Sequence, residues 1–127
     1  MKEAYVSYEI AKLLKEKGFD VPIGRMYVSP NNEFVWCETF AFFEKYDELV
    51  PTCTHQMACS WLREEHEIDI IPVIRHSLKY AQESPFRDYA CRVYDCDGNI
   101  VLSATKWYSR YENAVEAALE YSLKNLI

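Results

Sequence analysis

The chain has 127 residues, of which half are hydrophobic, 27% are charged and only 3 are glycines. This is the composition of a soluble globular protein, and it excludes a disordered or fibrous chain. The acidic side chains outnumber the basic ones by 20 to 14, so the net charge of −6 opposes binding to a phosphate backbone. We expect one domain that spans residues 1–127.

The cysteines and the N-terminus bear on the cellular compartment in which we expect the protein. Five cysteines at irregular spacings do not match the disulfide framework of a small secreted protein. Residues 1–16 are charged and lack the apolar run of a signal peptide. No stretch approaches the ~20 apolar residues that cross a bilayer. We therefore expect a cytoplasmic protein with reduced thiols that has no membrane association.

The first half of the chain predicts a helix and a hairpin. Apolar residues at helical spacing predict an amphipathic helix over 5–17. Two β-branched and aromatic segments, 25–28 and 34–38, flank the turn-forming cluster 29–33 and predict a β-hairpin. Segment 40–50 fits both periods, so we expect an irregular or short helical connection there.

The middle of the chain predicts a second helix and a strand. Thr54 is a suitable N-cap for a helix that runs to about His66. The apolar run 68–71 predicts a strand. Residues 75–87 carry no clear period, and we expect a loop with a helical turn.

The last part of the chain predicts a second hairpin and a third helix. Segments 89–94 and 100–107 flank an Asp-Gly pair, which is a strong signal for a tight hairpin turn. Ser109 followed by Glu112 fits a capping box that opens a helix to about residue 126.

The predicted fold class is α+β. Strands grouped in hairpins favour a mostly antiparallel sheet, built from two hairpins plus one strand and packed by three helices in the order α-β-β-α-β-β-β-α. The predicted core consists of the apolar stripes and the most hydrophobic strand: Leu13, Leu14, Met57, Trp61, Ile70, Val115 and Leu119.

A metal site is the first chemical possibility that the sequence raises. His55, Cys59 and His66 share one face of the predicted helix. The helical rise separates the two histidines by about 16 Å along the axis, and one zinc with bonds of ~2.0–2.3 Å does not span that distance. We expect neither a bound metal nor another cofactor.

Two further motifs bear on catalysis. Cys59 with His55 or His66 supplies the residue types of a thiol nucleophile and its base, without a local signature. Glu112, Glu116 and Glu120 form a carboxylate ridge at i, i+4 spacing, which is more typical of a solvated helix face. We expect a protein that is not an enzyme.

Two features point towards binding. Ten tyrosines suit either the margins of a core or a protein–protein surface. Residues 71–92 are locally basic and combine cations with an aromatic ring, which suits single-stranded nucleic acid. The candidate binding residues of this segment are Arg75, His76, Lys79, Tyr80 and Arg87.

Three helical segments carry a resemblance: residues 5–19, residues 56–64 and residues 111–119. Together they resemble a family of small uncharacterised proteins encoded by bacteria and by phages or mobile elements. The resemblance implies shared helix packing and brings no functional residues, because it rests on helix faces and caps.

The sequence leaves three functions open. The leading hypothesis is a small cytoplasmic protein-interaction module of phage or mobile-element type, which forms a homo-oligomer or binds another protein. The alternative is a nucleic-acid-binding accessory protein that acts through the basic segment. The third is a small enzyme with a Cys/His or carboxylate site.

Overall fold

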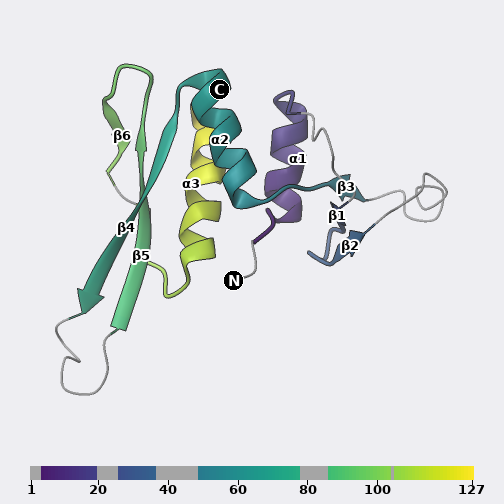
Figure 1. Cartoon of the computed structure of the whole chain (residues 1–127), viewed down its shortest axis with the longest axis horizontal. Helices are drawn as coiled ribbons and strands as arrows, with labels where there is room; N and C mark the ends of the chain where they lie inside the picture. Colours follow the sequence, from purple (N-terminus) through teal and green to yellow (C-terminus); the bar gives the residue numbers. More distant parts are fainter. Residues whose placement is uncertain (1–3, 20–25, 37–48, 78–85, 104) are drawn as a thin grey trace. The chain divides into compact units, whose positions relative to one another are not determined.

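A computed structural model describes residues 4–19, 26–36, 49–77, 86–103 and 105–127 (Figure 1). The chain has an α+β fold with the predicted order of elements, to which the two-residue strand β3 is added. Its strands pair in two antiparallel three-stranded sheets, in the orders β2-β1-β3 and β4-β5-β6. It divides into two compact units, residues 1–58 and 59–127, which we describe separately. That the whole chain is one domain stays a prediction.

The predicted first hairpin is confirmed. Strands β1 (Met26–Val28) and β2 (Phe34–Trp36) pair antiparallel, and β3 (Val50–Pro51) adds to the other edge of β1. The turn is closed by Asn32, which takes a left-handed φ of 62°. Asparagine tolerates this conformation better than most residues do. The expected connection over 40–50 lies mostly outside the described residues.

Helix α1 (Tyr8–Glu16) provides the apolar face of the first unit. Its buried residues Ile10, Ala11 and Leu14 follow helical spacing, whereas Leu13 is only half-buried. The chain before the helix is held by backbone bonding, because the Val6 amide donates to the Cys53 carbonyl at 2.9 Å. The buried Thr52 hydroxyl donates to the Val6 carbonyl at 2.9 Å.

Helix α2 (His55–His66) begins where the sequence predicts. The Met57 amide donates to the Thr54 hydroxyl at 3.2 Å, which confirms Thr54 as the cap. Its buried side agrees with the apolar stripe Met57, Ala58, Trp61, Leu62 and Glu65 only in part. Ala58 and Leu62 have no exposed surface, whereas Met57 is 39% exposed and Trp61 is half-buried. The predicted burial of Met57 and Trp61 is therefore wrong, because the helix is rotated towards the Ala58 and Leu62 side of that stripe.

The second unit is organised by a long antiparallel ladder. Strands β4 (Asp69–Ser77) and β5 (Phe86–Tyr94) pair along their whole length, from Asp69 opposite Tyr94 to Ser77 opposite Phe86. The expected loop with a helical turn over 75–87 is therefore wrong at both ends, which are extended strand. Backbone pairing across the ladder replaces the apolar period that the sequence lacks there. Residues 78–85 lie outside the described part of the chain.

Helix α3 (Tyr111–Asn125) packs against β4 and β5 (Figure 1). It buries the expected Val115 and Leu119 together with Ala114, Ala118 and Leu123. The predicted capping box is wrong, because Arg110 occupies the N-cap and makes no side-chain cap bond. The Tyr108–Tyr89 bridge keeps the preceding chain extended, so the helix begins one residue later than Ser109 requires.

Strand β6 (Ile100–Leu102) completes the second hairpin through a turn at Gly98, which has a φ of 79°. The expected strand over 100–107 is shorter than predicted. Beyond β6 the chain still follows β5, because the Tyr89 and Tyr108 amides each donate to the other residue's carbonyl at 2.7 and 2.8 Å. The edge of β5 is therefore paired along most of its length.

Core truncation should separate buried from exposed positions on α2. We expect Leu62→Ala to lower the free energy of unfolding by about 2–5 kcal/mol, because it leaves a cavity. Met57→Ala, on the exposed side of the same helix, should change it by about 0.5 kcal/mol or less. Urea denaturation followed by circular dichroism measures both. Equal losses for the two variants would contradict the described rotation of α2.

Candidate functional site

The strongest candidate surface is the face of the β4-β5-β6 sheet opposite α3, which we call the outer face. Residues paired across an antiparallel ladder share a face, and successive residues alternate between faces. Cys91 and Val93 of β5 are fully buried on the α3 side. The alternate positions therefore form the outer face: Ile71, Val73 and Arg75 of β4, and Asp88, Ala90, Arg92 and Tyr94 of β5.

Arg75 lies toward the Ser77 end of this surface and has two partners. Its Nη2 donates to Oδ2 of Asp88, the residue opposite it on β5, at 3.0 Å. Its guanidinium also lies 4.3 Å from the centroid of the Trp107 ring. The cation–π contact contributes about 0.5–1 kcal/mol at such an exposed site. These contacts hold a planar cation over an aromatic ring in one orientation.

The small side chain of Ala90 makes this arrangement possible. Ala90 has Val73 opposite it on β4. Because Tyr108 bridges Tyr89, the register places Trp107 beside Ala90 on its other side. Ala90 has no exposed surface although it belongs to the outer face. A larger side chain here would occupy the space that Arg75 crosses to reach the indole.

The outer face exposes more apolar surface than a solvated sheet requires. Ile71 is 44% exposed and Trp107 is 38% exposed. Its second cation, Arg92, is also engaged, because its Nε donates to the Ser103 carbonyl at 3.1 Å. The face therefore combines fixed arginines with exposed apolar groups.

The sequence-derived binding residues are only partly brought together. Arg75 is on the outer face, and the backbone of His76 pairs with that of Arg87 across the β4–β5 ladder. The side chains of His76 and Arg87 lie outside the described part, as do Lys79 and Tyr80 entirely. Sequence reasoning missed Asp88 and Trp107 as the partners of Arg75. A strand prediction extended from 68–71 to Arg75 would have placed Ile71, Val73 and Arg75 on one face, but the sequence shows no period that extends it.

The residues considered for metal binding have structural surroundings. His55 is buried at the start of α2, and the His66 ring lies edge-on to Trp61 with centroids 4.8 Å apart. Among the described residues, no three histidine, cysteine or acidic side chains are grouped to hold a metal ion. The expectation of no metal or cofactor stays a prediction.

The Cys59 thiol is not activated as a nucleophile. Burial raises its pKa to about 11, although Arg63 opposes the shift. Burial also raises the pKa of the Cys91 thiol to about 12, with a contribution from Cys59. A reactive cysteine needs a lowered pKa, since the thiolate is the attacking species. The absence of enzyme activity stays a prediction.

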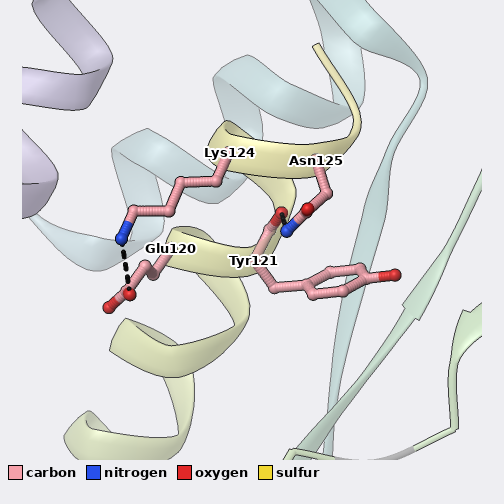
Figure 2. A network of polar contacts seen from close by, with 4 residues as sticks. All are labelled: Glu120, Tyr121, Lys124 and Asn125. Atoms are coloured by element: carbon pink, nitrogen blue, oxygen red, sulfur yellow. Dashed lines mark hydrogen bonds and ion pairs between the residues drawn. The ribbon is translucent and has the colours of Figure 1, made fainter.

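The acidic ridge of α3 is tied into the helix surface. Lys124 donates to Glu120 at 2.9 Å, one turn away (Figure 2). The side-chain amide of Asn125 donates to the Tyr121 carbonyl at 3.0 Å, while the Tyr121 hydroxyl donates to the Val101 carbonyl at 3.1 Å. Glu120 is thus part of a solvated face, and Tyr121 belongs to the margin of the core.

Comparisons with protein-family models, with curated proteins and with solved structures gave no match. The resemblance to small bacterial and phage proteins stays a prediction. In the described part of the chain, no helix is long and apolar enough to cross a bilayer.

The thiols should differ in reactivity according to these surroundings. We expect iodoacetamide at pH 8 to modify the exposed Cys96 quickly, while Cys59 and Cys91 stay protonated and react at least tenfold more slowly. Peptide mapping by mass spectrometry measures each site. Fast modification of Cys59 in the folded protein would contradict the described burial.

The same two thiols should make the stability depend on pH. Because folding raises the pKa values of Cys59 and Cys91, the free energy of unfolding should fall as the pH rises above 9.

Proposed function

We propose that the chain is a small cytoplasmic protein-interaction module and that its outer face binds a partner protein. The Arg75–Trp107 pair carries the proposal. Arginine and tryptophan are the residue types that dominate binding energy at protein interfaces. Here they are held by Asp88 and the sheet, so that little conformational entropy is lost on binding.

Exposed apolar surface on the same face supports a protein as the partner. Ile71 lies four residues before Arg75 on β4 and exposes area that a partner would remove from water. The guanidinium has five N–H groups, of which one donates to Asp88. The surface therefore suits an apolar partner surface that carries carbonyl or carboxylate oxygens where it meets Arg75.

The same contacts disfavour nucleic acid. Arg75 is neutralised by Asp88, Arg92 is bonded to the Ser103 carbonyl, and the chain carries a net charge of −6. Binding to phosphates requires cations that release counterions, and the described outer face offers few. The indole of Trp107 is occupied by the guanidinium on one side, which limits base stacking.

A photo-crosslinker placed at position 71 tests the proposed surface in cells of the source organism. We expect a crosslinked species of defined mass, and we expect Trp107→Ser to reduce it at least tenfold. The matched control has the crosslinker at Glu120, an exposed position on α3. Intact-mass measurement of the recovered complex identifies the partner. The proposal is overturned if position 71 captures nothing, captures only a second copy of this chain, or captures the same species as position 120.

Fluorescence anisotropy with a labelled single-stranded oligonucleotide tests the alternative function. We expect no binding tighter than micromolar to DNA or RNA at physiological salt, and a shallow salt dependence with a slope on the order of −0.7 per phosphate contacted. A nanomolar isotherm that is lost in the Arg75→Ala/Arg87→Ala variant would replace the protein-interaction proposal with nucleic-acid binding.

A further inference from the structure

Strand β4 has a hydrogen-bonding edge that is open among the described strands. Within the described part of the chain β4 pairs with β5 alone, because it stands at the end of the order β4-β5-β6. The Tyr89 amide and carbonyl bond to Tyr108, and the Cys91 carbonyl accepts from the Thr105 amide. Their partners on β4, Ile74 and Pro72, therefore form non-hydrogen-bonded pairs and direct their peptide groups away from β5.

The alternation of hydrogen-bonded and non-hydrogen-bonded pairs determines which peptide groups of β4 point away from β5. The outward peptide groups belong to positions 70, 72, 74 and 76. Pro72 has no N–H, so the row of donors is interrupted at one known point. Proline within a sheet is confined to such edges, which accounts for its place in this strand.

The side chains along the edge are exposed and apolar. Ile71 is 44% exposed and Ile74 is 54% exposed, on opposite faces of the sheet, and Val73 between them is half-buried. A polar or lysine-bearing edge would discourage pairing with another strand. Between Asp69 and Arg75 this edge has no charged side chain.

We propose that a second copy of this chain pairs antiparallel with β4 and that Val73 lies opposite Val73 of the partner subunit. In this register Ile70 pairs with position 76 of the partner, and both hydrogen bonds of that pair form. Pro72 pairs with Ile74 of the partner subunit, where its carbonyl accepts from the isoleucine amide. The hydrogen bonds that this register does not form are those that would need an N–H group on Pro72 of either chain.

Neighbouring registers form fewer hydrogen bonds, bring like charges together or extend beyond the strand. Centring the pairing on position 72 sets the two prolines opposite each other, and neither can donate. Centring it on position 75 sets the two copies of Arg75 directly opposite each other, which is destabilising. Centring it on position 74 leaves Ile70 beyond position 77, outside the β4 strand.

The Val73 register also keeps like charges apart. Arg75 lies opposite Ile71 of the partner subunit, so that no two side chains of the same charge face each other directly. Within each chain Arg75 stays bonded to Asp88 at 3.0 Å and Asp69 accepts from Arg63 at 3.1 Å, so neither charge needs a partner from the second copy.

The dimer has a consequence for the outer face. A two-fold axis perpendicular to the sheet places the outer faces of both copies on the same side. The two β4-β5-β6 sheets become one continuous sheet with two Arg75–Trp107 pairs. This inference stands on the β4 edge and does not require that the outer face binds a partner.

Symmetric crosslinking tests the register directly. In a Cys96→Ser background we expect Val73→Cys to form a disulfide-linked dimer on mild oxidation, because the two Cα atoms of a non-hydrogen-bonded pair lie within the range of a disulfide. The matched control is Ile71→Cys, which should crosslink at least tenfold more slowly because its counterpart is Arg75 of the partner subunit. Non-reducing electrophoresis measures both rates.

Sedimentation velocity over a range of concentrations provides the second measurement. We expect the unmodified chain to show a monomer–dimer equilibrium and Val73→Asp, checked for folding by circular dichroism, to be monomeric. The proposal is overturned if the unmodified chain stays monomeric to millimolar concentration, or if Val73→Cys and Ile71→Cys crosslink equally. A dimer that Val73→Asp leaves intact would place the interface elsewhere and also overturn it.

Discussion

The described second unit depends on the antiparallel ladder between β4 and β5. Its register from Asp69 to Ser77 assigns each side chain of both strands to one of two faces. One face receives α3 and is apolar at Cys91 and Val93. The other carries Arg75 and its partners. A slip of one residue would exchange these two sets, so that buried apolar groups specify the register.

The ladder also explains why an arginine can be fixed on an exposed sheet. Asp88 lies directly opposite Arg75, a position at which oppositely charged side chains of neighbouring strands can pair. Trp107 arrives from the segment that continues beyond β6 along the far edge of β5. Ala90 lies between them and leaves the guanidinium room to reach the indole. None of these contacts is strong alone, and their combination is what orients the surface.

The two edges of the long β4–β5 ladder differ in their backbone hydrogen bonding. The edge of β5 is paired, first by β6 and then by Thr105 and Tyr108. The edge of β4 carries Pro72, which limits the registers that an incoming strand can use. Pro72 thus disfavours the indefinite addition of strands and makes the symmetric register centred on Val73 more favourable than the neighbouring registers. The outer face and the β4 edge follow from one register and share the β4 residues Ile71, Val73 and Arg75.

Local patterns determined much of this protein by themselves. Turn residues at 29–33 and at Asp97-Gly98 marked both hairpins, and the Thr54 hydroxyl marked the start of α2, because these signals act within a few residues along the chain. The α+β class followed from the order of such segments. The stripes around Leu14, Val115 and Leu119 were equally clear, because helical spacing alone brings their side chains to one face.

Tertiary structure decided the rest, since the remaining choices depend on partners that are distant in sequence. Met57 and Leu62 are both apolar, and the packing around α2 selected which of them is buried. Residues 75–77 and 86–88 have no period of their own and became strand by pairing with each other. Ser109 lost the cap to Arg110 because the Tyr89–Tyr108 bridge holds the chain extended. Arg75 read as a free cation in a basic segment, and only the register placed Asp88 and Trp107 against it.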